Sequence, residues 1–420
     1  MNNFQRVFRN TSYLFISEIL IKALGLFWVI FLARNLSVDK YGMYNVVVSF
    51  VAIFSFLPDL GVGIITIREI AKHKKRASKL LGEAFLLNVL LAVFTVIVAF
   101  ASSYFLHIQM HFLVFISLII LFFSTIRSVS VFYFDGMEKM QYSAILNGFN
   151  SFLLIAFAVI ALLLFNGSLT AVFFGMLVGT IISMSISYVV LYKHEKIHFT
   201  LDISRSLFLL KEGVPLGIAS FAALVYSRVD VVMLSKFLGD AQAGIYSAAT
   251  PFPMAAVQLL NVPFVVAVYP TLSRLHSEDI DRFKKGILKS VGVIALWSIT
   301  ASIITSLSAP IVIPLIFGEK YDLAIPVLQV LVFIVPFISL YALLYKVLII
   351  IHKQKNYLII SISGAVMSIC FNLILIPHLG LMGAAIAAVV TNAILFLIYF
   401  ITVVFYVYKK SLHDVVKYFT

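Results

Sequence analysis

The sequence predicts an all-α polytopic membrane protein with about twelve transmembrane helices in two six-helix lobes. Of its 420 residues, 62% are hydrophobic and only 12% are charged, whereas an average soluble domain has about 25% charged residues. Long apolar runs recur along the whole chain, and its two halves resemble each other. A surface so poor in charge must face lipid.

The apolar runs locate the helices. A spanning helix needs about 20 mainly apolar residues, because each residue rises ~1.5 Å and the hydrocarbon is ~30 Å thick. The first half has six such runs, at 11–33, 42–66, 80–106, 112–134, 142–165 and 169–192. The second half has six more, at 213–236, 243–270, 287–316, 323–350, 357–376 and 381–407. The first run is too long for the ~7–15-residue core of a signal peptide and is therefore predicted to stay as a membrane helix.

These runs divide the chain into an N-lobe (1–192), a linker (193–212), a C-lobe (213–408) and a cytoplasmic tail (409–420). In the linker, one apolar stripe recurs at helical spacing opposite Asp202, Arg205 and Lys211. The stripe consists of Phe199, Ile203, Leu207 and Leu210. It predicts an amphipathic cytoplasmic helix, which either slides as the lobes move or is an inert connection.

Basic residues predict the orientation. Most of the 31 lysines and arginines fall in alternate connections, such as 68–79 and 274–289, and at the two termini. The opposite ends contain only Arg34, Lys40, Lys236 and Lys320. Because basic residues stay on the cytoplasmic side, both termini are predicted to be cytoplasmic, in a multi-pass protein of the cell membrane.

The two halves share a short pattern. The stretch from Ala33 to Tyr44 aligns with that from Ser235 to Tyr246, with a basic residue, a leucine and Gly-x-Tyr in common. Each half has an even number of helices and would insert with the same orientation, which predicts a parallel repeat with pseudo-two-fold symmetry. In such transporters the binding site lies at the interface between the repeats.

Charged residues deep in a membrane cost ~2.5–3.5 kcal/mol each on insertion scales, so each needs a partner or a water-filled cavity. Lys22, Arg127 and Arg228 are candidates for a cationic cavity that binds an anionic head group, since guanidinium forks match phosphate oxygens. Glu18, Asp230 and Asp59 are candidates for counter-charges or for ion coupling. Glu18 and Lys22 are four residues apart and can also neutralise each other, whereas Arg228 and Asp230 point to opposite sides of their helix.

Other chemistry has no support in the sequence. There is no nucleotide-binding loop and no metal-ligand spacing, and Cys370 is the single cysteine. The connections are too short for a catalytic domain. We therefore expect no enzyme activity, no metal or other cofactor and no nucleic-acid partner, while coupling to H⁺ or Na⁺ stays open.

Several stretches together resemble the Wzx-type polysaccharide-biosynthesis flippases of the multidrug/oligosaccharidyl-lipid/polysaccharide exporter superfamily. They are Ala33–Leu36 with Tyr41–Tyr44, Asp59–Gly61 with Arg68–Glu69, Phe134–Met140, Arg228–Leu234, Gly244–Ala249, Phe317–Tyr321 and Gly380–Ala385. The resemblance spans nearly the whole chain. It implies a MATE-like fold of two helical bundles around a central cavity.

The same resemblance implies that the protein flips a polyprenyl-(pyro)phosphate-linked oligosaccharide or polysaccharide repeat unit from the cytoplasmic to the outer leaflet by alternating access. Membrane lipid, the anionic lipid-linked glycan and glycan-assembly proteins are the implied partners. The lipid II flippase branch has two further helices that are absent here, which counts against a peptidoglycan precursor. The alternatives are an ion-coupled multidrug exporter of the same superfamily, a membrane glycosyltransferase and a major-facilitator transporter. The exporter would favour an acidic cavity.

Overall fold

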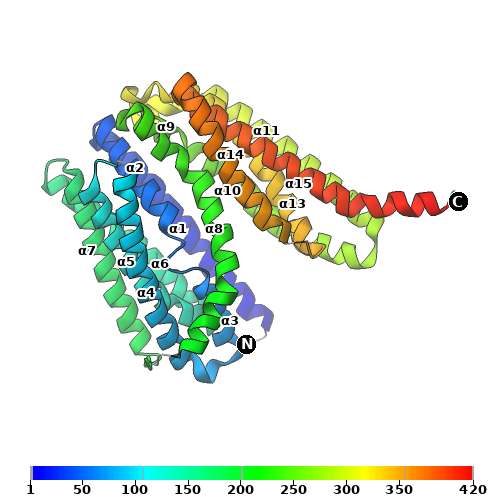
Figure 1. Ribbon diagram of the computed structural model, residues 1–420, viewed down its shortest axis with the longest axis horizontal. Coiled ribbons are helices and arrows are strands. Elements are labelled where there is room, and N and C mark those ends of the chain that lie inside the picture. Colours follow the sequence, from blue (N-terminus) through cyan, green and yellow to red (C-terminus); the bar gives the residue numbers. More distant parts are fainter. Residues whose placement is uncertain (1–2, 107, 200–201, 354, 419–420) are drawn as a thin grey trace. The chain divides into compact units, whose positions relative to one another are not determined.

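The computed structural model describes residues 3–106, 108–199, 202–353 and 355–418, and every regular element in these ranges is a helix (Figure 1). The chain divides into two compact units, residues 1–224 and 225–420. The predicted lobe and linker boundaries stay a prediction.

Helices of the first unit are connected by short loops. They are α1 (Asn3–Asn35), α2 (Val38–Phe54), α3 (Val62–Lys72), α4 (Ala77–Phe105), α5 (His111–Gly136), α6 (Met140–Leu164), α7 (Leu169–Tyr192) and the first part of α8 (Ile203–Leu238). The second unit contains the rest of α8 and seven more helices. These are α9 (Asp240–Ala249), α10 (Pro251–Glu278), α11 (Ile280–Phe317), α12 (Ala324–Leu331), α13 (Ile334–Ile350), α14 (Lys355–Leu379) and α15 (Leu381–Tyr418).

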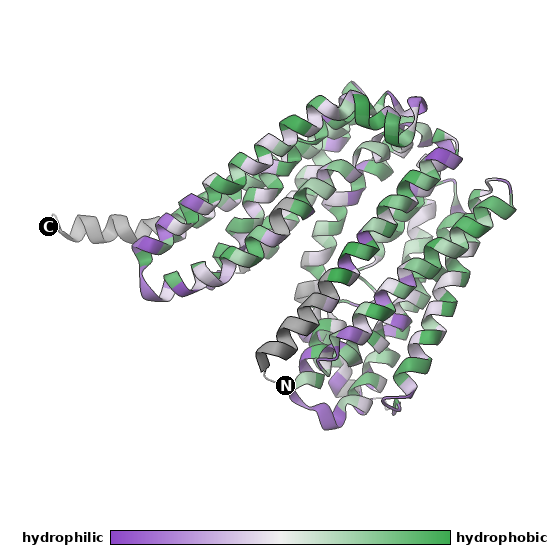
Figure 2. Cartoon of the chain, turned by 180° about the vertical axis from the view of Figure 1, so that it is seen from behind, coloured by the Kyte–Doolittle hydropathy of each residue, from purple (hydrophilic) through white to green (hydrophobic). Residues whose placement is uncertain are grey.

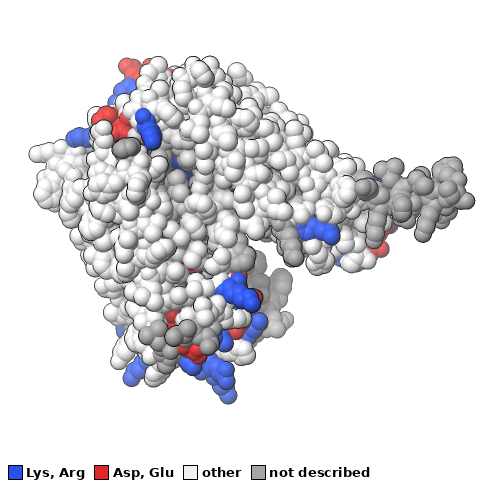
Figure 3. Space-filling model, viewed as in Figure 1, with Lys and Arg blue, Asp and Glu red and all other residues white. Residues whose placement is uncertain are grey.

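Ten stretches of the described chain are long and apolar enough to cross a membrane. Figure 2 shows hydrophobic residues along the helices and hydrophilic ones mainly near their ends. On the face seen in Figure 3, charged side chains likewise gather at helix ends, with uncharged atoms between them. The all-helical, multi-pass class is therefore confirmed, while the count of twelve spanning helices stays a prediction.

Two predicted spans, 42–66 and 213–236, are not among the ten. The first is interrupted, because α2 ends at Phe54 and α3 begins only at Val62. Leu60 and Gly61 between them adopt left-handed backbone angles, with φ of 42° and 79°. That conformation cannot continue a helix, and glycine adopts it most readily. The second falls within α8, whose later turns contain the charged Arg228 and Asp230.

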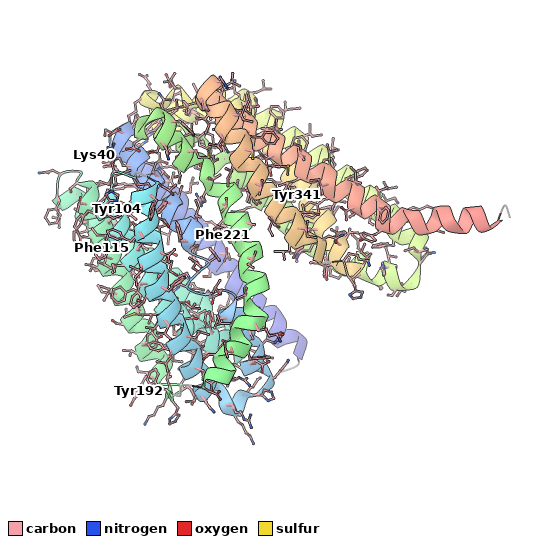
Figure 4. The ribbon with its side chains drawn as sticks, in the orientation of Figure 1. Lys40, Tyr104, Phe115, Tyr192, Phe221 and Tyr341 are labelled. Atoms are coloured by element: carbon pink, nitrogen blue, oxygen red, sulfur yellow. The ribbon has the colours of Figure 1, made fainter. Side chains whose placement is uncertain are left out.

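Loops at the two ends of the first unit are held together by separate contacts. At one end, Lys74 Nζ lies 3.8 Å from Glu138 Oε2, and the Ser78 hydroxyl donates to the Lys196 carbonyl. At the other end, Lys40 Nζ donates to the Gly167 carbonyl at 3.1 Å. Figure 4 shows Lys40 and Tyr192 at these opposite ends. The basic connections of the first half that were predicted to share one side of the membrane therefore share one end of this unit.

Helices α6 and α7 pack backbone to backbone through two glycines one turn apart. A Cβ atom at Gly175 would lie 2.4 Å from the Phe157 carbonyl oxygen, and one at Gly179 would lie 2.7 Å from that of Leu153. Small residues at this spacing allow membrane helices to approach closely. The pair explains why α6 and α7 form a tight hairpin.

We expect Gly175→Ala to destabilise the protein by about 1–3 kcal/mol, since the backbone carbonyl in its way cannot move aside without separating the helices. Gly25→Ala in α1 is the matched control, because a Cβ there meets nothing within 4 Å and alanine favours a helix. Thermal unfolding in detergent measures both. Equal melting temperatures for the two variants would contradict this account of the packing.

The first turns of α8 pack on α3 and α4 through one row of residues four apart. In this row, Leu209 is 1% exposed and joins an apolar cluster with Val62 and Ile65. Further along, a Cβ at Gly213 would lie 2.5 Å from the Leu60 carbonyl oxygen, so the two backbones touch. We call Arg205, Leu209, Gly213 and Gly217 the α8 seam.

The α8 seam differs from the apolar stripe expected in the linker. Leu207 and Phe199 of that stripe are 61% and 58% exposed, and the side chain of Ile203 lies outside the described residues. Leu210 is the member of the stripe that packs inward, against the same apolar cluster as Leu209. The inward face of the helix instead begins with Arg205, which the sequence pattern assigned to the polar side. The reason is a pair of buried carboxylates, described below.

Candidate functional site

Arg127 lies in the middle of α5, inside the first unit, and its guanidinium is only partly satisfied. One nitrogen, Nη2, donates to the Asn147 side-chain oxygen on α6 at 3.2 Å. The other two, Nε and Nη1, are buried without an acceptor among the described residues. Since unpaired buried donors cost free energy, this geometry favours an oxygen-rich anion or water beside the guanidinium.

Two features fix the surroundings of Arg127. The Tyr188 hydroxyl on α7 donates to the Ile126 carbonyl at 2.7 Å, which anchors α5 next to the guanidinium. On α6, Asn150 lies about one turn from Asn147, and its side-chain oxygen is buried without a donor. Arg127 thus belongs to a polar patch on α5 and α6 that contains both donors without acceptors, on Arg127, and an acceptor without a donor, on Asn150.

Glu18 and Lys22 form an ion pair on α1, with their charged atoms 3.6 Å apart and side chains 62% and 47% exposed. They do not face α6, because α1 contacts that helix through Ser17, whose hydroxyl donates to the Ala144 carbonyl at 2.8 Å. Both charges fall inside the span Ile16–Asn35. Charges at this depth are costly against hydrocarbon, so this face of α1 favours a hydrated or protein-lined environment.

Asp59 has a local structural contact. Its Oδ1 accepts a hydrogen bond from the Gly63 backbone N–H at 2.8 Å, across the break between α2 and α3. That contact satisfies one of the free N–H groups at the start of α3. The structure therefore does not bring Asp59 together with the cationic candidates by any described contact.

In the second unit, Asp230 is held by α9. Its Oδ2 accepts from the Tyr246 hydroxyl at 2.6 Å, and its Oδ1 accepts from the Val231 N–H at 2.8 Å. Tyr226 lies one turn earlier on the same face of α8. Its hydroxyl is 3.2 Å from the hydroxyl of Tyr341 on α13, and Figure 4 labels Tyr341. Tyr341 in turn donates to Asn392 on α15 at 3.4 Å.

This inward packing of Tyr226 and Asp230 turns Arg228, which lies between them, to the opposite side of α8. Arg228 is exposed within its unit and has no hydrogen-bond or ion-pair partner in the part of the chain that the structure describes. A free guanidinium fork on a membrane helix is available to an anionic ligand.

The partners of these residues were not predictable from the sequence. In the sequence, Tyr246 belongs only to the Gly-x-Tyr repeat, and nothing marks Asn147 as a partner of Arg127. Pairing between residues far apart in sequence leaves no trace in a single chain.

A cluster of ionic groups at the basic end of the first unit was also missed. Arg205 on α8 places Nη2 3.1 Å from Glu69 Oε2 on α3, and Nε 3.8 Å from Glu83 Oε2 on α4. The two glutamate side chains are 10% and 2% exposed. Lys79 Nζ lies 3.8 Å from the other oxygen of Glu83. These four residues, which we call the basic-end ion cluster, bind the start of α8 to the helices before it.

Comparison with known proteins places this arrangement in a family. The model of the family described as "Polysaccharide biosynthesis protein" matches residues 7–276. A protein assigned as an O-antigen transporter in Shigella dysenteriae is 24% identical over 87% of this chain and 91% of its own length.

Solved structures show the same fold. An inward-facing MATE-family multidrug resistance transporter of the MOP superfamily gives a TM-score of 0.77 at 16% identity, covering 92% of this chain and 94% of that one. The lipid II flippase MurJ, in an inward closed conformation, gives 0.77 at 16% identity, covering 92% and 86%. Because the family model matches well over half of the chain, this membrane protein belongs to the polysaccharide biosynthesis protein family.

Proposed function

We propose that this protein flips a polyprenyl-(pyro)phosphate-linked oligosaccharide or polysaccharide repeat unit from the cytoplasmic to the outer leaflet of the cell membrane by alternating access. The observation that carries the proposal is the Arg127 guanidinium, in which two buried nitrogens, Nε and Nη1, have no acceptor in the described chain. A phosphate or pyrophosphate oxygen would satisfy them, and the fork geometry suits it. Family membership and the O-antigen transporter relative support the same substrate class.

We propose the following roles for the candidate residues. Arg127 and Arg228 would bind the anionic head group, and the exposed Glu18–Lys22 pair would line the same hydrated path. Asp230, held by Tyr246, would act as a counter-charge or a coupling site for H⁺ or Na⁺. Both termini would lie in the cytoplasm, and glycan-assembly proteins would deliver and remove the substrate. Transport needs no enzymatic step in this chain.

Deletion of the gene in its own host tests the proposal. Surface glycan should be lost, and lipid-linked glycan should accumulate on the inner leaflet. Complementation with Arg228→Ala should restore at most about a tenth of the export, because a charge-assisted contact is lost. Arg228→Lys should restore more, since it keeps the charge without the fork. Normal surface glycan with raised sensitivity to cationic drugs would instead support the multidrug exporter.

A further inference from the structure

Two basic segments meet at the basic end of the first unit, where Figure 3 shows lysine and arginine side chains. One is the short 3-10 helix η1 (Lys74–Arg76) between α3 and α4, and the other is segment 193–199, which follows α7. Ser78 joins them, because its hydroxyl donates to the Lys196 carbonyl and accepts from the His198 N–H at 3.2 Å. Segment 193–199 is thereby fixed on the start of α4.

Four cations of these segments have no carboxylate partner in the described chain, and we call them the lysine–arginine patch. They are Lys75, Arg76, Lys193 and Lys196, and all four are exposed. Two neighbouring cations differ, since Lys72 and Lys79 lie 3.6 and 3.8 Å from glutamate oxygens. Lys196 Nζ instead lies 5.8 Å from the centroid of the Tyr192 ring. A cation–π contact uses no hydrogen-bond donor, so the N–H groups of the patch stay available to an anion.

The lysine–arginine patch lies at the ends of two membrane spans, Lys74–Phe105 and Leu169–Tyr192. Each of its cations is therefore within about one helical turn of a span end. The large rings of Tyr192 and Phe199 beside it are 66% and 58% exposed, and Figure 4 labels Tyr192. Aromatic and basic side chains together at the ends of spanning helices are typical of the head-group layer. The patch therefore lies at the depth of lipid phosphates.

Anionic phospholipids fit this position better than a soluble acidic protein does. A head-group phosphate offers acceptors to the Arg76 guanidinium fork and to the lysine ammonium groups, and each basic residue near an anionic surface adds to the attraction. A stable protein interface needs a buried apolar centre, whereas the exposed rings beside the patch lie where lipid reaches them. Glu195, the single carboxylate in segment 193–199, is half-buried and does not offset four cations.

We propose that the lysine–arginine patch binds the head groups of anionic phospholipids. The bound lipid is a neighbour in the leaflet and not the transported substrate, so this site does not depend on the proposed function. Binding would hold η1 and segment 193–199 at the membrane surface. Because these segments adjoin the ends of α4 and α7, anionic lipid would stabilise the folded first unit.

Thermal unfolding of the full-length protein in an uncharged detergent, titrated with phosphatidylglycerol, measures this binding. The melting temperature should rise saturably, whereas phosphatidylcholine, whose head group is neutral overall, should have little effect. Lys75→Gln, Arg76→Gln, Lys193→Gln and Lys196→Gln together should weaken the apparent affinity for phosphatidylglycerol at least tenfold, because several basic residues attract the same anionic surface. Replacing the three lysines by arginine keeps the charge and should keep the binding.

The matched control removes the same number of charges elsewhere. Arg34→Gln, Lys40→Gln, Lys236→Gln and Lys320→Gln together remove exposed cations that are scattered over other helix ends, and should change the affinity less than twofold. Equal weakening by the two quadruple variants would show attraction to net charge alone and would overturn the patch. If the first quadruple variant does not fold, Lys75→Gln with Lys193→Gln removes half of the patch and should still weaken binding about threefold.

Sodium pyrophosphate distinguishes a lipid head group from a soluble phosphate. Alone, it should cause no saturable rise in the melting temperature, since it lacks the membrane anchor that concentrates a lipid at the patch. A patch-dependent rise with pyrophosphate would identify a soluble ligand and overturn the lipid assignment. Absence of any phosphatidylglycerol effect in the wild-type protein would overturn it as well, and would favour an acidic protein as the partner.

Discussion

Replacing Arg127 by alanine should reduce transport of lipid-linked glycan by about 10- to 100-fold, the equivalent of one or two charge-assisted hydrogen bonds, and should not lower stability. In the described structure the guanidinium makes one hydrogen bond and leaves Nε and Nη1 buried and unpaired. Burying these unpaired donors lowers the free energy of unfolding, so removing the guanidinium should leave the fold equally or more stable. Flipping by purified protein in proteoliposomes and thermal unfolding measure the two effects.

Matched variants sharpen this result. Arg127→Lys should retain part of the transport, since it keeps the charge but loses the planar fork. Lys236→Ala removes a basic residue that is exposed at the end of α8 and should transport normally. A fall in the melting temperature of Arg127→Ala with unchanged transport would mean that the guanidinium only supports packing between α5 and α6.

In contrast to Arg127→Ala, Arg205→Ala should cause a large loss of stability. It leaves Glu69 and Glu83 buried without their shared cation, at 10% and 2% exposure. Breaking a fully buried ion pair costs about 3–5 kcal/mol, and we expect roughly 2 here, because Arg205 is 30% exposed. In addition, Lys79 still faces Glu83, and Arg68 and Lys72 still face Glu69. The measurement is thermal unfolding in detergent.

A second substitution tests the mechanism of that loss. Adding Glu83→Gln to Arg205→Ala removes one of the two buried charges that have lost the arginine and should recover part of the lost stability. Glu278→Gln, at an exposed pair with Arg274 in the second unit, is the control and should recover none. Additive losses in the double variant Arg205→Ala with Glu83→Gln would refute the basic-end ion cluster as the cause.

Fold class was predictable because its signal is local. Apolar runs of spanning length identify membrane helices one at a time, and most of the predicted runs coincide with single helices of the structure. The runs 42–66, 243–270 and 323–350 each extend over two helices. The break in 42–66 was visible only as Pro58 and Gly61, since the left-handed angles of Leu60 and Gly61 are properties of the folded backbone.

The candidate site was predictable only in part. Charge in an apolar run identified Arg127 and Arg228, because any such charge is costly. The carboxylates that turn Arg205 of α8 inward are Glu69 on α3 and Glu83 on α4. Their positions cannot be inferred from the sequence of α8 alone. The amphipathic pattern therefore placed Arg205 outward, although two buried glutamates hold it inward.

The α8 seam also has a consequence for biosynthesis. Glu69 and Glu83 leave the ribosome long before Arg205, the cation shared between them. The N-terminal helices can insert in order, but until the first turns of α8 have been made the two glutamates have only cations of their own helices beside them. These are Arg68 and Lys72 for Glu69, and Lys79 for Glu83. Completion of the first unit therefore depends on residues after its last hairpin, and a nascent chain stopped at residue 192 would be an unfinished unit exposed to quality control.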